Sequence, residues 1–160
     1  MGLDAPRLSG QVDATGMSIG IIVSRFNTEI TQALLQGAVN ALKSHGSTNQ
    51  DLHIVYVPGA FEIGTIAAFM AKSERYDAII CLGCVIRGGT AHFEYVCRGT
   101  MDAINAIAMR GDIGVGNGVL TVDTFEQALE RVGGSHGHKG AEAALTAVEV
   151  TTTLRKLGNI

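Results

Sequence analysis

The sequence predicts an α/β fold in which a four-stranded parallel sheet is doubly wound, with helices on both faces. Short apolar runs rich in β-branched residues alternate along the whole chain with stretches whose apolar residues recur at helical spacing. Neither an internal repeat nor a linker interrupts this alternation. The 160 residues are therefore expected to form a single domain over 17–160, preceded by a flexible N-terminal segment over 1–16.

The first half of the chain supplies two strands and two helices. Residues 17–24 are a β-branched run typical of a buried strand. Apolar residues recur at helical spacing over 30–42, and Gly46 marks the end of that helix. Residues 52–57 alternate in polarity, as in a strand nearer the edge of a sheet, and 63–70 again show helical spacing.

The second half continues the same alternation. Residues 78–86 are a long apolar run that predicts a buried strand, and apolar residues over 93–107 outline the next helix. A fourth strand is expected at 116–122, after a glycine-rich turn. A glycine- and histidine-rich loop at 133–140 leads to a helix from Ala141 onward.

The C-terminal part contains a possible helix cap and a β-branched run. Thr124-x-x-Gln127 has the form of a capping box, which predicts a short helix after the fourth strand. Residues 148–153 are rich in β-branched side chains and are also compatible with a strand. We favour a helix there because no turn signal separates them from the preceding alanines.

Charge and hydropathy exclude two classes of partner. The net charge is −3 and the basic residues are scattered, so the chain lacks the basic patch of a nucleic-acid-binding protein. No apolar run approaches the roughly 20 residues that span a bilayer. The N-terminus shows no secretory signal pattern, and a cytoplasmic protein without a membrane partner is expected.

The three cysteines fit no disulfide framework. Cys81 and Cys84 form a C-x-x-C motif, but they lie inside a predicted strand rather than at a helix start, where a redox thiol acquires its low pKa. Their odd spacing directs the two side chains to opposite faces of a sheet. We therefore expect buried, inert thiols.

A polar or glycine-bearing turn ends each predicted strand, and the turns lie at 24–27, 58–62, 87–90 and 121–124. Because the strands are parallel, these turns meet at one rim, where open α/β sheets bind ligands. The Arg-Gly-Gly-Thr turn at 87–90 is the most specific of them. Glycines let main-chain N–H groups approach an anion, and the helix that follows adds partial positive charge. An ordinary turn with a solvent-exposed arginine is an equal alternative.

Histidines supply the remaining candidates for chemistry. His92 begins the helix after that turn, and a neutral imidazole there can accept a proton, although a lone surface histidine is the alternative. His136 and His138 have no evident third ligand, so no metal is expected. The G-x-G-x-G motif at 114–118 precedes a strand and lacks the context of a dinucleotide-binding loop. The pattern suits an anionic small molecule and proton transfer.

Taken in order, five motifs resemble the 6,7-dimethyl-8-ribityllumazine synthase family: S-R-F-N, V-P-G-A-F-E-I, G-C-V-I-R-G-G-T-A-H-F-E-Y-V, N-G-V-L-T-V-D-T-F-E-Q-A-L-E-R and H-K-G-A-E-A-A. The resemblance covers about residues 17–157. It implies a flavodoxin-like fold and a transferase that uses no cofactor. This enzyme condenses 5-amino-6-ribitylaminouracil with 3,4-dihydroxy-2-butanone 4-phosphate, releasing phosphate and water, in the penultimate step of riboflavin biosynthesis.

The resemblance also implies an assembly. Family members form homopentamers with active sites between neighbouring subunits, and riboflavin synthase is a candidate further partner. The loop at 133–140 has the glycine pattern of members that close twelve pentamers into an icosahedral shell of sixty subunits. Because His138 replaces the usual asparagine, a free pentamer and a shell both stay open.

By motif position, the resemblance implies that His92 is the catalytic residue and transfers protons. The implied substrate contacts are Phe26 at the pyrimidine ring; Gly59, Ala60 and Glu62 at the ribityl chain; Val85 and Ile86 at the pyrimidine edge; Gly89 and Thr90 at the phosphate, with Arg131 from the adjacent subunit; and, along the interface, Asn117 and Lys139.

Two positions depart from the common family form. Asn117 stands where many members carry an aromatic residue, and Gly64 replaces a frequent proline, which predicts a looser helix start. Neither belongs to the acid–base or phosphate groups, so activity is still expected. The alternatives are a non-catalytic lumazine- or flavin-binding protein and a shell-forming protein whose activity is secondary. A phospho-relay receiver is excluded because its aspartates are missing from the ends of the first and third strands.

Overall fold

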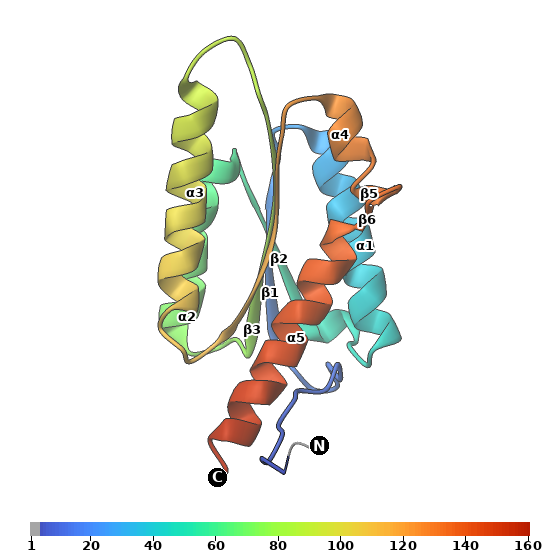
Figure 1. Cartoon of the computed structure of the whole chain (residues 1–160), viewed down its shortest axis with the longest axis vertical. Coiled ribbons are helices and arrows are strands. Elements are labelled where there is room, and N and C mark those ends of the chain that lie inside the picture. The colour runs from blue at the N-terminus through green and yellow to red at the C-terminus, as the bar shows by residue number, and fades with distance from the viewer. Residues whose placement is uncertain (1–3) are drawn as a thin grey trace.

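The computed structural model describes residues 4–160, so the first three residues of the predicted segment 1–16 lie outside the described residues. The main sheet has four parallel strands in the order β2-β1-β3-β4 (Figure 1). This arrangement confirms the predicted flavodoxin-like α/β fold. The strands are β1 (Ile19–Ser24), β2 (Leu52–Val57), β3 (Ala78–Ile86) and β4 (Gly114–Val122).

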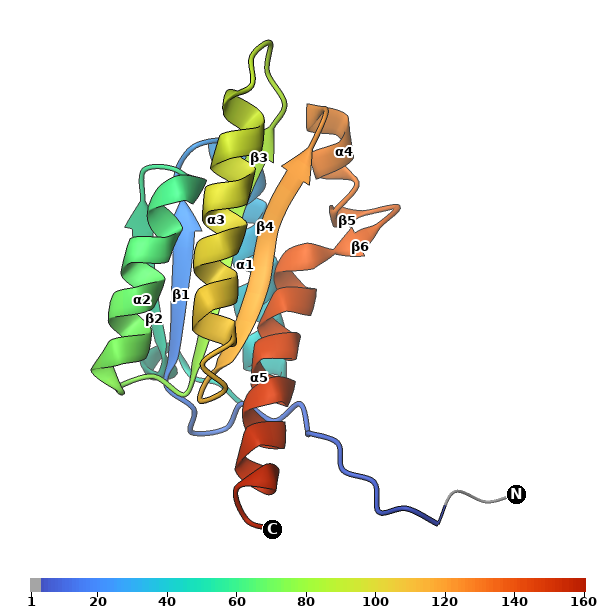
Figure 2. The same cartoon turned by 60° about the vertical axis from the view of Figure 1, so that its left-hand side comes forward.

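Helices cover both faces of the sheet (Figures 1 and 2). One face carries α1 (Thr28–Ser44), α5 (Lys139–Leu157) and the short α4 (Phe125–Leu129), and the other carries α2 (Ile63–Ser73) and α3 (His92–Ala108). Single 3₁₀ turns, η1 (Asn49–Asp51) and η2 (Ala60–Glu62), precede β2 and α2. The carboxyl ends of the strands therefore meet the N-termini of the following helices at one rim.

Two buried apolar clusters, one on each face of the sheet, hold the layers together. Cys84 belongs to the cluster under α1 and α5, whereas Cys81 belongs to the cluster under α2 and α3. Both thiols are free and buried, as predicted. Burial raises the pKa of Cys81 to about 12 and that of Cys84 to about 11. A redox role for this pair is therefore disfavoured by both position and protonation.

The predicted start of the fourth strand was two residues late. β4 begins at Gly114, so Gly114 and Val115 belong to the strand and not to the preceding turn. A Cβ at Gly114 would lie 2.3 Å from the main-chain oxygen of Ala147 in α5. The missing side chain thus allows α5 to pack directly on β4, a tertiary reason that a local pattern does not contain.

The predicted loop at 133–140 also contains more structure than expected. Most of it forms an antiparallel hairpin of β5 (Val132–Gly134) and β6 (Gly137–His138), and α5 begins immediately afterwards at Lys139. Residues 148–153 are helical, which confirms the favoured alternative.

Gly64 has a packing role at the start of α2. It is buried, and a Cβ at this position would lie 2.5 Å from the Cβ of Ala103 in α3. The glycine therefore allows α2 and α3 to approach closely.

The described part of the N-terminal segment lies against α5. Gln11 and Thr152 exchange two hydrogen bonds: the Gln11 N–H donates to Thr152 Oγ1 at 2.8 Å, and the Thr152 hydroxyl donates to the Gln11 carbonyl at 2.7 Å. The Nζ of Lys156 donates to the carbonyl of Ser9 at 2.8 Å. Across residues 4–160, no helix is long and apolar enough to cross a membrane.

Candidate active site

A cavity of about 640 Å³ opens at the carboxyl ends of the strands, beside the N-terminus of α3. Its walls come from the turn after β1, the segment 58–62 after β2, and the end of β3 together with the first turns of α3. The predicted site residues that line it are Phe26, Gly59, Ala60, Glu62, Val85, Ile86, Thr90 and His92. Three turns that are distant in sequence thus form one site at the rim that the strand pattern indicated.

The turn after β1 presents Phe26 to the cavity. Its side chain is 73 % exposed, so little packing from its own subunit covers the ring. The main chain is held against β2, because the Arg25 N–H donates to the Val57 carbonyl at 2.8 Å and the Phe26 N–H donates to the Pro58 carbonyl at 3.0 Å. A flat apolar face at this position suits stacking with an aromatic ring.

Glu62 closes the turn after β2. Its Oε2 accepts a hydrogen bond from the Gly59 N–H at 3.0 Å. An ionised carboxylate has about four lone-pair sites, so this bond leaves acceptor capacity for the hydroxyl groups of a ligand. Glu62 is exposed and lines the cavity, so a hydroxylated ligand in the cavity can contact its carboxylate.

The turn from β3 into α3 combines a hydroxyl, uncovered main chain and an imidazole. Thr90 Oγ1 accepts a hydrogen bond from the His92 N–H at 3.4 Å. Within residues 4–160, no heavy atom outside the adjacent residues lies within 4 Å of the place where a Cβ on Gly88 or Gly89 would stand. The first N–H groups of a helix lack intrahelical acceptors, and α3 begins at His92. The turn therefore offers donors for an anion next to a group that can transfer a proton.

Arg87, which the sequence pattern presented as the cation of this turn, is engaged elsewhere. Its Nε donates to Asp123 Oδ1 at 2.7 Å, its Nη1 pairs with Glu94, and its guanidinium carbon lies 4.3 Å from the centre of the Phe93 ring. The ion pairs hold the pKa of Glu94 below its usual value and raise that of Arg87. Arg87 does not line the cavity. It joins the end of β3 to α3 and to the turn after β4.

Gly89, Asn117, Arg131 and Lys139 are not among the residues that line this cavity. Gly89 still belongs to the turn that carries Thr90. Asn117 is exposed on the edge strand β4, where its Nδ2 donates to Met101 Sδ at 3.2 Å. Within this one chain, the site is assembled without these four residues.

Arg131 lies between α4 and the hairpin, and Lys139 is the first residue of α5. Both helices cover the face of the sheet that also carries α1 (Figure 1). The Nη1 of Arg131 donates to the Gln127 carbonyl at 2.8 Å and lies 3.7 Å from Glu130 Oε2. The Nζ of Lys139 pairs with Glu142 Oε2 at 2.8 Å. Both cations are therefore held at the surface of α4 and the start of α5.

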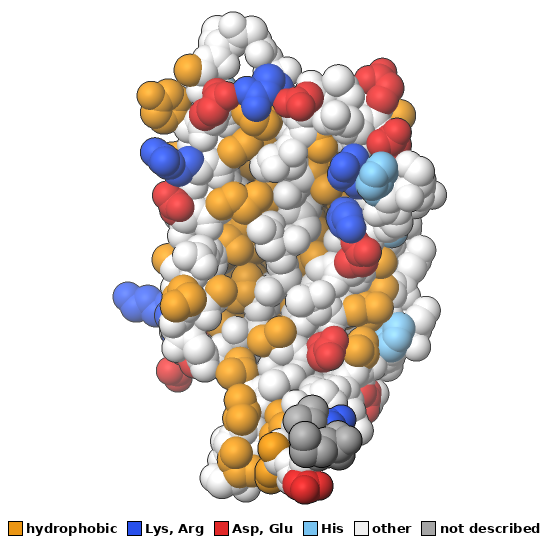
Figure 3. Space-filling view, viewed as in Figure 1, with side chains coloured by type: hydrophobic (Ala, Val, Ile, Leu, Met, Phe, Trp, Pro, Cys, Tyr) orange, Lys and Arg blue, Asp and Glu red, His pale blue; other side chains and the backbone are white. Residues whose placement is uncertain are grey.

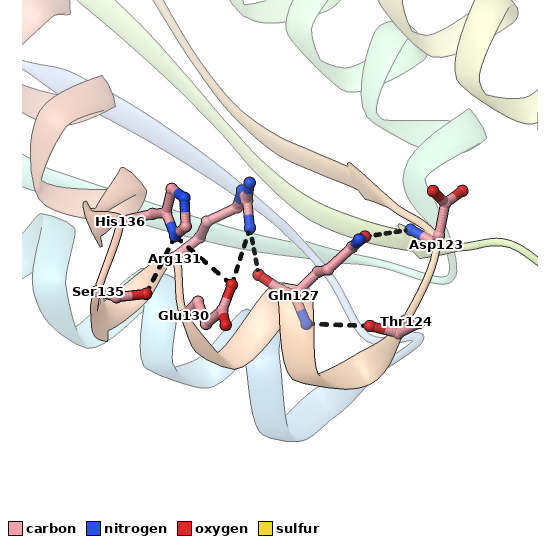
Figure 4. A network of polar contacts seen from close by, with 7 residues as sticks. All are labelled: Asp123, Thr124, Gln127, Glu130, Arg131, Ser135 and His136. Carbon is pink, nitrogen blue, oxygen red and sulfur yellow. Dashed lines mark hydrogen bonds and ion pairs between the residues drawn. The ribbon is translucent and has the colours of Figure 1, made fainter.

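Figure 4 shows the network that supports Arg131. Thr124 Oγ1 accepts a hydrogen bond from the Gln127 N–H at 3.2 Å, and Gln127 Oε1 accepts one from the Asp123 N–H at 2.7 Å. These two bonds confirm the predicted short helix with its N-terminal cap. His136 Nδ1 lies 3.5 Å from Glu130 Oε2 and 3.1 Å from Ser135 Oγ, on the hairpin side of the network.

Asn27, Phe61 and Tyr95 also line the cavity, although no role was predicted for them. The side chains of Phe61 and Tyr95 are 60 % and 69 % exposed. All three fall inside the motifs on which the family resemblance rests. Large aromatic side chains next to strand ends, in a chain with few aromatics, were the available signal for the latter two.

The comparison with protein families agrees with the site geometry. The family model described as 6,7-dimethyl-8-ribityllumazine synthase matches residues 16–155. The match includes the whole four-stranded sheet, every turn that lines the cavity, and the α4 segment with Arg131. It spans most of the chain, so the chain belongs to the 6,7-dimethyl-8-ribityllumazine synthase family, whose members are transferases.

Proposed function

We propose that this chain condenses 5-amino-6-ribitylaminouracil with 3,4-dihydroxy-2-butanone 4-phosphate to give 6,7-dimethyl-8-ribityllumazine. The observation that carries this proposal is the cavity at the strand ends. It combines an exposed aromatic ring, a carboxylate, strand-end main chain, and a hydroxyl and an imidazole at a helix N-terminus. Each of these features matches one part of the two substrates.

The pyrimidine substrate fits the part of the cavity that the ends of β1, β2 and β3 line. Its ring stacks on Phe26, and its polar edge bonds to the main chain of Val85 and Ile86. Its ribityl hydroxyls donate to Glu62, beside Gly59 and Ala60. The butanone phosphate lies at the other end, against Thr90 and the start of α3.

The chemistry consists of bond changes that need protons moved but no redox step. The substrate amine attacks the ketone and loses water to form an imine. Loss of a proton then expels phosphate as its C–O bond breaks, and the enol that remains tautomerises to a ketone. The second amine attacks this ketone and closes the ring with loss of another water. His92 lines the cavity at the phosphate end, where an imidazole can accept and return these protons. Holding the two substrates together contributes a further 7–11 kcal/mol, roughly, to lowering the barrier.

The charge of the phosphate supports a site shared between subunits. Among residues 4–160, no lysine or arginine lines the cavity, and Glu62 is acidic. A buried dianion without a cation is costly. Arg131 of an adjacent subunit would supply a bidentate partner for the phosphate, Lys139 would add a second cation, and Asn117 would line the same interface.

The surface supports the homopentamer that this arrangement requires. β4 is an edge strand, and hydrophobic side chains gather over the sheet between α3 and α5 (Figure 3). Phe69 and Met109 are 63 % and 76 % exposed, so α2 and the end of α3 present further apolar surface. Such surfaces mark association sites in soluble proteins. The sixty-subunit shell and a complex with riboflavin synthase are further proposals, which light scattering and co-sedimentation would test.

The test is to mix the purified protein with both substrates and follow lumazine absorbance and inorganic phosphate together. Equal amounts of product and phosphate, at a rate above that of the uncatalysed mixture, are expected. Tight binding of lumazine without product formation would instead favour a non-catalytic binding protein. Glu74→Gly, a change in the α2–β3 connection outside the cavity, provides the control for handling and folding.

A further inference from the structure

The residue after Phe26 has an unusual conformation. Asn27 has φ 60° and ψ 49°, in the left-handed region that non-glycine residues rarely occupy. It is also the N-cap of α1, where residues normally have an extended backbone and accept a first-turn N–H through their side chain. The side chain of Asn27 makes no such capping bond. Its amide is therefore used for something other than the helix.

That amide connects two strands beyond the end of their ladder. Asn27 Nδ2 donates to the carbonyl of Cys84 at 2.8 Å. The pairing of β1 with β3 ends at Val23 and Leu82, so Cys84 lies past the last paired position. The side chain of Asn27 continues the link between the strands at the point where the main chain of β1 turns away.

The turn at 25–27 is consequently held from both sides. The main chain of Arg25 and Phe26 bonds to the end of β2, and the Asn27 amide bonds to the end of β3. The ring of Phe26 projects from this held turn and is 73 % exposed, so little packing fixes its position. The Cys84 end of the bridge immediately precedes Val85, and Asn27 itself lines the cavity.

We propose that Asn27 is a positioning residue for the planar ring of the pyrimidine substrate, an inference that rests on the proposed function. Its bond to Cys84 sets the distance between the stacking face of Phe26 and the main-chain groups of Val85 and Ile86. Without it, the turn shifts relative to β3, and a ring that stacks on Phe26 no longer meets those groups. The phosphate end of the cavity, at Thr90 and His92, does not depend on this bond.

Two substitutions separate the amide from the backbone conformation. Asn27→Gly keeps the left-handed conformation accessible and removes the amide. Asn27→Asp keeps the shape but turns the donor into an acceptor that faces the Cys84 carbonyl. Loss of one hydrogen bond predicts a KM for the pyrimidine that rises roughly three- to tenfold in Asn27→Gly, with a larger rise in Asn27→Asp. The KM for the butanone phosphate and kcat are expected to change little.

The matched control is Glu74→Gly, because Glu74 is the other non-glycine residue with positive φ in the described chain (φ 57°) and lies outside the cavity. It should leave both KM values unchanged. KM does not depend on the concentration of active enzyme. The comparison therefore holds even if circular dichroism shows that a variant is partly unfolded. An unchanged pyrimidine KM in both Asn27 variants of an active enzyme would overturn the inference.

A double-mutant cycle distinguishes positioning from general destabilisation. In a Phe26→Ala background there is no ring to position, so Asn27→Gly should have little further effect on the pyrimidine KM. Additive effects would show that Asn27 acts independently of Phe26 and would refute the proposal. A wild-type protein that forms no lumazine refutes the proposed function instead, so the two failures are distinguishable.

Discussion

The imidazole of His138 lies on the main chain of α1 at Gly37, where an added Cβ would stand 2.0 Å from the ring Cε1. The same ring caps α5, because its Nδ1 accepts a hydrogen bond from the Ala141 N–H at 3.3 Å. One side chain thus joins α1, the hairpin and the start of α5. Lys139, a proposed contact to the neighbouring subunit's site, is the next residue.

Gly37→Ala should therefore destabilise the protein and loosen the hairpin. The added methyl displaces the His138 ring, at a cost of about 1–3 kcal/mol for overpacking, and the displaced ring can no longer cap α5. Chemical denaturation measures the change in unfolding free energy. Gly158→Ala is the control, since its nearest neighbours would lie at an ordinary 3.6 Å and its φ is negative. In Gly37→Ala/His138→Ala the clash is absent, so stability below that of His138→Ala would contradict this explanation.

Arg87→Lys tests the structural role of Arg87. Lysine keeps the positive charge but loses the planar fork that reaches both Asp123 and Glu94. We expect the turn at 88–91 to become less ordered, which lowers kcat, while the KM for the butanone phosphate changes little. Amide hydrogen exchange in residues 88–94 would report the loosened turn. A KM effect on the phosphorylated substrate as large as that of Arg131→Ala would instead place Arg87 in the anion site.

The parts of the fold that depend on local pattern were predictable, and those that depend on tertiary contact were not. The apolar run at 78–86 identifies β3 with its correct bounds, and the capping box at Thr124 identifies α4. Gly114 was assigned to the turn because the reason for a glycine there is the main-chain oxygen of Ala147 in α5, which is distant in sequence. The gathering of strand-end turns into one cavity followed from parallel topology alone. The hydrogen bond from Asn27 to Cys84 could not be predicted in this way, because an asparagine in the left-handed conformation leaves no signal in hydrophobic periodicity.

The cysteines should react with a thiol reagent in a defined order. Cys97 is half-buried, whereas Cys81 and Cys84 are buried with pKa values raised to about 12 and about 11. Iodoacetamide at pH 8 should modify Cys97 slowly in the native protein and all three thiols in denaturant, as mass spectrometry would show. Native Cys97→Ser should remain unlabelled. Cys84 lines the cavity, so its rapid labelling would show that the cavity wall opens to solvent.

The same two thiols predict a loss of stability in alkali. Their folded pKa values lie above the value of 9.0 for a free thiol, so between the two values the unfolded state has released a proton that the folded state retains. The contribution of these thiols to the free energy of unfolding is therefore fully present below pH 9, and it is lost as the pH rises towards 11. Denaturation midpoints of wild type and of Cys84→Ala, measured from pH 8 to pH 10.5, should converge as the pH rises. A difference that is constant with pH would contradict the assignment.

His92→Ala should lower turnover and leave substrate binding largely intact. General acid–base catalysis is typically worth about 10²–10⁴-fold, and we expect the low end because the variant still holds both substrates together. Steady-state kinetics should show the loss in kcat, with both KM values near those of wild type. An unchanged kcat would remove His92 from the mechanism. His92→Gln, which keeps hydrogen-bonding capacity but cannot carry the proton, should be as slow as the alanine variant.

The proposed shared site makes a prediction that mixing two impaired variants can test. Arg131→Ala should raise the KM for the butanone phosphate and leave that for the pyrimidine unchanged, because a guanidinium–phosphate pair is lost. In this chain Arg131 lies across the sheet from the cavity, so its proposed partner is the site of another subunit. Subunits of His92→Ala and Arg131→Ala, unfolded together in equal amounts and refolded, would then form some sites with His92 from one chain and Arg131 from the other.

If each site takes its two halves from different subunits at random, about one quarter of the sites in the mixed oligomer carry both wild-type residues. Activity at low butanone phosphate should recover to about that fraction of wild type, although neither variant alone reaches it. Each variant refolded by itself is the control for yield, and light scattering confirms that the mixture reassembles. Because a site built within one chain always carries one of the two substitutions, mixed oligomers no more active than the average of their parents would place Arg131 and His92 in the same subunit's site or remove Arg131 from it.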